Sequence, residues 1–161
     1  MSPREFIEPS QWYAGLPTVY VSVCVLITDP QERVLIVKPN YRDYWAIPGG
    51  ILDEGESPDQ TAAREVTEEL GLVIPIGDLL VFDWAPPMGA RLKVMTNLVF
   101  DGGTLQDPDL IRLQEDELDD FAFLPWDQAA ARLPANTAAR IPAALRARKD
   151  QRTIYLPATS P

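Results

Sequence analysis

Three glutamates lie close together near the middle of the chain, at Glu65, Glu68 and Glu69. Their spacing of i, i+3 and i+4 places the carboxylates on one side of an α-helix, within reach of one point in space. Crowded carboxylates repel one another and raise one another's pKa values. A cation relieves that repulsion, and oxygen ligands favour hard cations such as Mg²⁺ or Mn²⁺. The pattern therefore indicates a metal site that polarises a phosphoryl oxygen or generates a hydroxide-like nucleophile.

A simpler interpretation needs no ligand at all. A glutamate-rich helix with a few arginines is usually a solvated face, and the short stretch from Arg64 to Glu69 taken alone favours that interpretation. The sequence around the glutamates has to decide between the two.

A well-defined helix carries these glutamates. Ser57 is suited to the N-cap, Pro58 to the first helical position, and Gln60 to the reciprocal half of a capping box. Gly71 stands where a left-handed C-terminal residue is required. We therefore predict a helix of about 13 residues that ends at Leu70. Its apolar stripe consists of Ala62, Val66 and Leu70.

The remaining elements are predicted from periodicity and turn residues. Strands are expected over residues 18–28, 33–38, 79–84, 92–100 and 121–124, with the first two forming a hairpin and a short extended piece at 45–48. Residues 101–103 are expected to form a turn. Helices are expected over 126–133 and 136–148. An extended arm (1–17), with Trp12 and Tyr13 packed on the body, and an extended tail (150–161) complete one domain of 161 residues. This order indicates an α/β or α+β sandwich.

Composition excludes several classes of function. The chain contains no histidine, which removes Ser-His-Asp and Cys-His catalysis and His-ligated zinc. The net charge of −10 argues against a binder of duplex nucleic acid. The single Cys24 lies in an apolar run and is expected to be a buried, inert thiol. No apolar run is long enough to span a membrane and none resembles a signal peptide, so we expect a cytoplasmic protein.

The stretch from Gly50 to Leu72 resembles the Nudix box. Its specified residues are Gly50, Glu56, Arg64, Glu65, Val66, Glu68, Glu69, Gly71 and Leu72. So many fixed positions across 23 residues form a highly specific pattern, and a weaker resemblance extends from about residue 18 to about residue 133. The resemblance implies an α/β/α sandwich with a mixed β-sheet, and a Mg²⁺- or Mn²⁺-dependent hydrolase of diphosphate linkages.

The resemblance also implies a role for each box residue. Glu65 and Glu69 would bind the metal, and Glu68 would bind metal or act as base. Arg64 would hold the glutamates in place, and Glu56 would support the metal–water network. Gly50 would shape the loop, and its carbonyl or that of Gly49 would be offered to a metal. A further acid is expected in a loop before a late strand. Glu117 fits best by its distance along the chain to Phe123, and Glu115 and Asp116 are alternatives. Glu117 is equally interpretable as an ordinary surface residue. With no histidine, the proton acceptor would be Glu68, Glu69, Glu117 or metal-bound hydroxide.

The resemblance implies a small anionic substrate that contains a diphosphate, such as ADP-ribose, a nucleotide sugar or a nucleoside triphosphate. Its candidate contacts lie outside the box, at Lys38, Arg42, Tyr44, Trp45 and Arg91. Trp45 is equally interpretable as an aromatic of the core or its rim, and for Trp84 we prefer that interpretation.

Three further expectations concern other functions and partners. A non-catalytic nucleotide sensor on the same fold is the alternative function, although such proteins often lose box residues. An isomerase similar to isopentenyl-diphosphate isomerase would need histidines that this chain lacks. Dimers are common in the family and among soluble proteins, so the arm with Trp12 and Tyr13 is a candidate homodimer interface.

Overall fold

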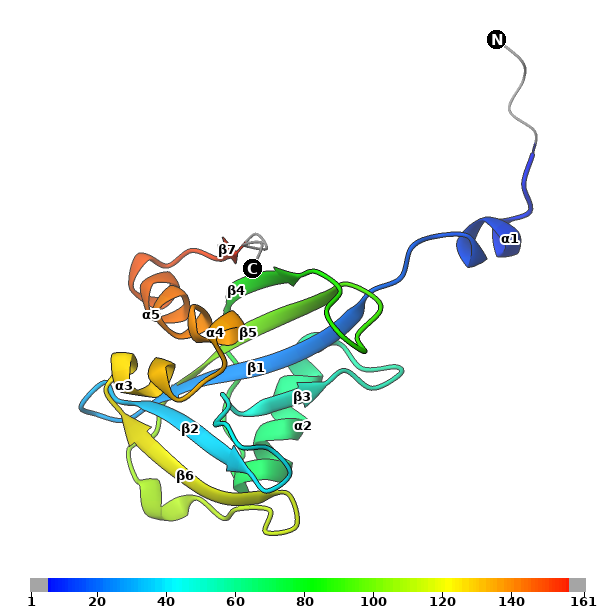
Figure 1. The fold of residues 1–161 in the computed structure, drawn as a ribbon. Helices are drawn as coiled ribbons and strands as arrows, with labels where there is room; N and C mark the ends of the chain where they lie inside the picture. The colour runs from blue at the N-terminus through cyan, green and yellow to red at the C-terminus, as the bar shows by residue number, and fades with distance from the viewer. Residues whose placement is uncertain (1–5, 157–161) are drawn as a thin grey trace.

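A single mixed β-sheet forms the centre of the computed structural model, which describes residues 6–156 (Figure 1). The strands along the sheet follow the order β6-β2-β1-β5-β4-β7, and β3 pairs with β1 off this path. β5 runs parallel to β1 and β7 parallel to β4, whereas the other pairs are antiparallel. The strands are β1 (Tyr20–Thr28), β2 (Val34–Pro39), β3 (Gly49–Ile51), β4 (Leu79–Ala85), β5 (Met95–Thr104), β6 (Leu118–Leu124) and β7 (Ile154–Leu156).

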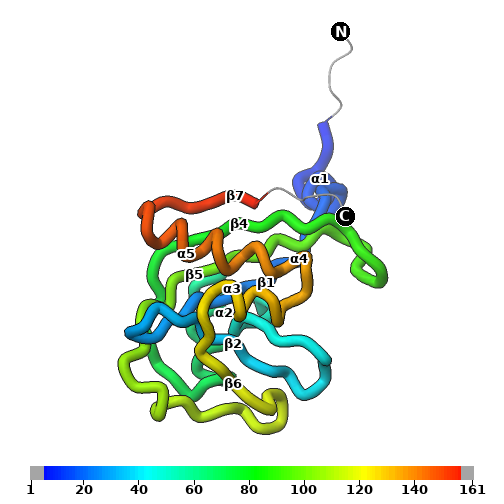
Figure 2. The backbone as a smooth tube through the Cα atoms, turned by 60° about the vertical axis from the view of Figure 1, so that its left-hand side comes forward, coloured from blue at the N-terminus to red at the C-terminus, as the bar shows by residue number. Residues whose placement is uncertain are grey.

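Helices cover both faces of this sheet. α2 (Pro58–Leu70) packs on one face, where Val66 and Leu70 meet the side chains of Val23, Val25 and Ile27 from β1. The other face is covered by α3 (Trp126–Ala131), α4 (Ala135–Ala138) and α5 (Arg140–Asp150) (Figure 2). Alternate residues of β1 therefore enter two different cores, which explains why the strand is apolar almost throughout. The predicted α/β/α sandwich with a mixed sheet is confirmed.

The helix predicted from capping residues has the expected bounds. Ser57 is the N-cap, and its backbone N–H donates to Oε1 of Gln60 at 2.9 Å. Gly71 ends the helix in the left-handed conformation, with φ of 65°. The predicted β1–β2 hairpin also forms, with Thr28 opposite Val34.

Strand bounds differ where pairing over long sequence distances prevails over local turn residues. β5 does not end at Phe100 but continues through the predicted turn, because Asp101 stays in register with Leu26 of β1 and Gly103 absorbs the irregularity at φ of 72°. β6 begins at Leu118 rather than at residue 121, because it pairs along the whole of β2. The short β3 and β7 arise in the same way, beside β1 and β4.

The predicted helix over residues 136–148 is wrong in one respect. Two helices, α4 and α5, meet at Ala139. Pro142 lies in the first turn of α5, where its missing N–H has no intrahelical partner to lose, so the helix has to restart shortly before this residue.

The N-terminal arm contains a helix, α1 (Pro9–Ala14), that stands away from the body (Figure 1). Trp12 and Tyr13 contact each other edge to face at 4.9 Å and remain 50% and 66% exposed. The expectation that they pack on the body is therefore wrong, because no residue of α1 is buried. Residues 1–5 of the predicted arm and 157–161 of the predicted tail lie outside the described residues. Within residues 6–156, no helix has the length and apolar character to cross a membrane.

Candidate active site

Arg64 is the centre of a cluster of acidic side chains on α2 and the loop before it. Its Nε donates to Oε1 of Glu56 at 2.8 Å, and its Nη1 donates to Oε1 of Glu65 at 2.9 Å and to Oε2 of Glu68 at 3.0 Å. Asp53 forms a fourth ion pair at 3.5 Å. These hydrogen bonds, led by the one to Glu56, raise the pKa of the Arg64 guanidinium above its ordinary value. One cation therefore contacts several carboxylates at once, and a role for Arg64 in positioning them for catalysis stays a prediction.

Glu56 fixes Arg64 from the loop side. Its Oε2 accepts from Nη2 of Arg64 at 3.1 Å and from the hydroxyl of Thr61 at 2.8 Å. The hydrogen bonds from Arg64 and then from Thr61 lower the pKa of the Glu56 carboxyl to about 2. Glu56 is thus a permanently charged partner of Arg64, which supports the expected indirect role.

Glu69 is the most buried of the acids in this cluster, with 8% of its surface exposed. Its Oε2 accepts a hydrogen bond from the backbone N–H of Gly49 at 2.9 Å. Burial and, to a smaller extent, the charges of Glu65, Glu117 and Glu68 together raise the pKa of Glu69 to about 8, although the hydrogen bond from Gly49 opposes the rise. A carboxylate in these surroundings is costly to ionise, and a nearby cation would relieve that cost.

The carboxylate of Glu65 lies directly over Gly50, in space that the Cβ of any other residue would need. Burial also raises the pKa of Glu65, although Arg64 opposes the rise. A Cβ on Gly50 would lie 2.2 Å from Oε1 of Glu65. A Cβ on Gly49, whose φ is 147°, would lie 2.0 Å from the carbonyl oxygen of Val23. The two glycines thus allow β3 to pass closely between β1 and the glutamates; a role for their carbonyls in binding metal stays a prediction.

Glu117 joins the cluster from a different part of the chain. It lies in the turn before β6, where its N–H donates to the Gln114 carbonyl at 3.0 Å and its own carbonyl accepts from Asn40 at 2.9 Å. Its charge is among the causes that raise the pKa values of both Glu65 and Glu69. This proximity favours Glu117 over Glu115 and Asp116 as the additional acid.

The donor set fits a hard divalent cation in its chemistry. All the donors are carboxylate oxygens, the acids outnumber the single arginine, and the pKa values of Glu65 and Glu69 are raised. Within residues 6–156, no three acidic or thiol side chains already surround a common point closely enough to enclose a metal. The carboxylates of Glu65 and Glu68 instead both accept hydrogen bonds from Nη1 of Arg64.

Three supporting contacts in this site were not predicted from the sequence. Thr61 is fully buried and holds Glu56, Asp53 pairs with Arg64, and the Gly49 N–H binds Glu69. A threonine five residues after Glu56 has no distinctive pattern, and the Gly49 contact depends on the pairing of β3 with β1. Of the three contacts, only the one from Gly49 was partly anticipated, by the expected close backbone approach at Gly49 and Gly50.

The candidate substrate contacts upstream of the box form a small cluster of their own. The Arg42 guanidinium stacks over Tyr44 at 5.6 Å and over Tyr41 at 5.1 Å. Lys38 donates its Nζ hydrogens to the carbonyls of Arg42 and Pro39, so it holds this loop together. Contact of Lys38, Arg42 or Tyr44 with substrate stays a prediction.

The other candidate contacts have structural partners as well. Trp45 is half-buried against the core beneath α3 and α5, and Arg132 stacks on its ring at 5.1 Å. Arg91 donates to the carbonyls of Ala85 and Pro86 within the β4–β5 loop. Trp84 is 37% exposed, which agrees with a rim aromatic. Cys24 is partly buried in β1, and burial raises the pKa of its thiol.

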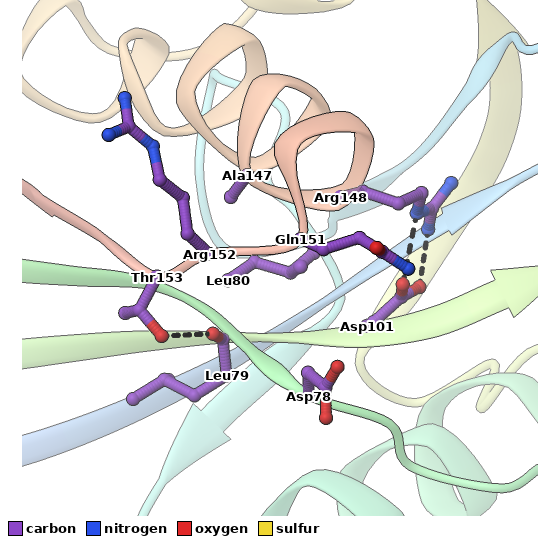
Figure 3. Close-up of a pocket in the computed structure, with 9 residues that line it drawn as sticks. All are labelled: Asp78, Leu79, Leu80, Asp101, Ala147, Arg148, Gln151, Arg152 and Thr153. Carbon is purple, nitrogen blue, oxygen red and sulfur yellow. Dashed lines mark hydrogen bonds and ion pairs between the residues drawn. The ribbon is translucent and has the colours of Figure 1, made fainter.

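A cavity of about 450 Å³ lies away from the glutamates, between the end of α5 and the strands β4 and β5 (Figure 3). Arg148 and Asp101 line it, and they form an ion pair at 2.6 Å. None of the box residues lines this cavity, so we attribute the chemistry to the Arg64 cluster and not to the cavity.

The arrangement of Gly50, Arg64 and the glutamates agrees with a comparison of the whole chain with known families. The NUDIX domain family model matches residues 19–145. The chain belongs to the Nudix family. This identification confirms the resemblance first seen in residues 50–72.

Individual Nudix proteins show the same relationship. An 8-oxo-(d)GTP phosphatase of Mycolicibacterium smegmatis is 33% identical over 103 residues, which cover 63% of this chain and 30% of that protein. A crystal structure of a UDP-X diphosphatase aligns with a TM-score of 0.70 and 23% identity over 94% of this chain and 76% of the other. The Nudix domain of Shewanella oneidensis NrtR, complexed with ADP ribose, aligns with a TM-score of 0.66 and 19% identity over 89% and 99%.

The family model shows the family of this chain, and the solved structures and curated relatives show less. The two structures are less than 25% identical to this chain and therefore show the fold alone. The chain spans less than half the length of the curated relatives it matches.

Proposed function

We propose that this Nudix protein is a Mg²⁺- or Mn²⁺-dependent hydrolase that cleaves a diphosphate linkage in a nucleotide-derived substrate. ADP-ribose, a nucleotide sugar and a nucleoside triphosphate are the candidate substrates. The observation that carries the proposal is the excess of carboxylates around Arg64, in which Glu69 is buried and carries a pKa raised to about 8. Such an excess has a chemical purpose if a divalent cation and its anionic substrate bind there.

Each residue has a distinct part in this proposal. Glu65 and Glu69 would hold the metal together with Glu68, and Arg64 and Glu56 would keep their carboxylates in position. When bound, the metal would neutralise charge that develops on the phosphoryl oxygens and would lower the pKa of water. The chain contains no histidine. The candidates for accepting the proton of the attacking water are therefore Glu68, Glu69, Glu117 and metal-bound hydroxide.

The named relatives support the reaction class and leave the substrate open. One is named for 8-oxo-(d)GTP, one for UDP-linked compounds, and one was crystallised with ADP ribose. All three ligands contain a nucleoside attached to a diphosphate. The cation–aromatic stack of Arg42 with Tyr41 and Tyr44 is the feature of this chain that would bind the remainder of such a ligand.

The test separates substrates from products by anion-exchange chromatography, with Mg²⁺ or Mn²⁺, across nucleoside triphosphates, nucleotide sugars, ADP-ribose, dinucleotides and isoprenoid diphosphates. Glu69→Gln is the test variant, and Glu115→Gln, an exposed neighbour of Glu117, is the matched control. We expect turnover of one substrate class that is lost in Glu69→Gln and kept in Glu115→Gln. Ligand binding without turnover, unchanged by Glu69→Gln, would instead establish a nucleotide-sensing domain.

A further inference from the structure

The turn that carries Glu117 is attached on one side to the end of α2. The backbone N–H of Gln114 donates to the carbonyl of Glu69 at 3.1 Å. The backbone N–H of Arg112 donates to the carbonyl of Leu70 at 2.8 Å. Carbonyls in the last turn of a helix lack an intrahelical partner, so these two hydrogen bonds complete the end of α2. The start of the turn is therefore fixed on the helix of the candidate metal site.

Asn40 holds the same turn from the other side. Its backbone N–H donates to the carbonyl of Glu117 at 2.9 Å, and its side-chain Nδ2 donates to the carbonyl of Asp116 at 2.7 Å. The pairing of β2 with β6 ends where Pro39 lies opposite Leu118, and a proline has no N–H to donate. Asn40, the next residue along the chain, thus supplies the hydrogen bonds that continue this pairing into the turn.

The two hydrogen bonds from Asn40 lie on either side of the Cα atom of Glu117. The carbonyl of Asp116 belongs to the peptide group before this Cα, and the carbonyl of Glu117 belongs to the peptide group after it. Because φ and ψ are the only soft rotations of the backbone, holding both peptide planes holds both angles of Glu117. The direction of its Cα–Cβ bond follows from these angles. Asn40 therefore sets the direction in which the Glu117 side chain leaves the turn.

The Glu117 carboxylate depends on this direction, because its side chain is exposed. Within residues 6–156, none of the ion pairs of Arg64 reaches it. Its charge nevertheless lies close enough to Glu65 and Glu69 to raise the pKa values of both. The place of Glu117 beside these acids is thus determined by the backbone of its turn.

We propose that Asn40 is a positioning residue, which acts through Glu117 and directs its carboxylate to the divalent cation at Glu65 and Glu69. This inference rests on the proposed metal-dependent function, and it concerns a residue outside the Nudix box. Asn40 also begins the loop that carries Arg42. One segment therefore holds both the additional acid and a proposed contact of the substrate.

The first experiment measures the Kd of Mn²⁺ by electron paramagnetic resonance, without substrate, in a double-mutant cycle. Asn40→Ala should raise this Kd by about tenfold in the wild-type background. In the Glu117→Gln background it should raise the Kd by less than about twofold, since the two residues act as a unit. Asn136→Ala, at an exposed asparagine of α4, is the control and should change neither value. An equal effect of Asn40→Ala in both backgrounds, or none in the wild type, would overturn the proposal.

The second experiment tests the attachment of the turn without metal or substrate. Amide hydrogen exchange in EDTA, followed by mass spectrometry, should be faster over residues 114–118 in Asn40→Ala than in wild type, because a hydrogen bond that holds this segment is lost. Exchange over α2 should stay the same. Glu117→Gln is the control, since it removes no backbone contact. Exchange over residues 114–118 that is unchanged in Asn40→Ala would overturn the proposal.

Turnover separates this inference from the proposed function. A wild type that binds Mn²⁺ but cleaves no diphosphate would contradict the hydrolase and leave the role of Asn40 at the cation intact. In an active enzyme, Asn40→Ala should lower kcat by about tenfold, with KM within about twofold of wild type. A raised KM with unchanged kcat would show that Asn40 serves the loop of Arg42 instead, and it would overturn the proposal.

Discussion

Arginines lie on both faces of the sheet, and the two faces differ in the number of acids that surround each arginine. On the face covered by α5, Arg140 pairs with Asp83 at 2.7 Å and Arg148 pairs with Asp101 at 2.6 Å, one acid for each cation. On the α2 side, Arg64 alone faces Glu56, Glu65, Glu68 and Asp53, with Glu69 and Glu117 nearby. The balanced pairs are complete as they stand. The unbalanced cluster is complete only with an additional cation.

The balanced side should behave as a purely structural element, with the largest effect on stability. Arg140 and Asp83 are both 8% exposed, so removal of one partner leaves a buried charge unpaired. Arg140→Met should lower the free energy of unfolding by about 3–5 kcal/mol, measured by urea denaturation. Turnover per folded molecule should stay within about twofold of wild type. Loss of turnover in folded protein would show that this pair also serves catalysis.

The unbalanced side should show the opposite behaviour. Glu69→Gln should lower kcat/KM for the identified substrate by at least about a hundredfold, since it removes a ligand of the proposed metal. In EDTA, the same variant should unfold at a temperature no lower than that of wild type, because a buried repelled carboxylate has been removed. A large loss of stability in EDTA would place Glu69 among the structural residues instead.

A smaller effect is expected from the glycine beneath Glu65. In Gly50→Ala, the new Cβ would lie 2.2 Å from Oε1 of Glu65 and has to displace that carboxylate. We expect a fall of about tenfold in activity and a higher requirement for Mg²⁺. Gly15→Ala is the matched control, since its Cβ would meet nothing closer than 3.5 Å. Equal activity in the two variants would mean that the position of Glu65 is unimportant.

The smallest expected effect is a change in how the stability of the metal-free protein depends on pH. The folded-state pKa of Glu69, about 8, lies above its ordinary value of 4.5, so the folded protein binds the extra proton between these values. The metal-free protein should therefore be more stable below pH 4.5, as far as this group is concerned, and should lose that stability as pH rises through 8. Thermal unfolding in EDTA should show a shallower slope in Glu69→Gln than in wild type. Identical slopes in the two proteins would contradict the raised pKa of Glu69.

The parts of this molecule that were predictable from sequence are local in origin. Ser57, Gln60 and Gly71 define the ends of α2 through contacts within a few residues, and the helical repeat then brings Glu65, Glu68 and Glu69 together. Arg64 follows from the same helix geometry, because it lies one turn before Glu68.

What was not predictable depends on contacts between distant segments. Residues 49–51 become β3 only because β1 lies beside them, and this pairing is what turns the Gly49 N–H towards Glu69. Glu117 approaches the cluster because β6 pairs with β2, a long-range match that no turn residue announces. The position of the arm was not predictable, because an apolar side chain such as Trp12 indicates burial without indicating which surface it contacts.

Binding of Mn²⁺ to the protein, followed by electron paramagnetic resonance, tests the central claim most directly. The account predicts that wild type binds Mn²⁺ without substrate, that Glu69→Gln weakens this binding by at least about tenfold, and that Glu115→Gln leaves it unchanged. Equal Mn²⁺ binding by wild type and Glu69→Gln, or none by either, would contradict the claim that the carboxylates around Arg64 form a cation site.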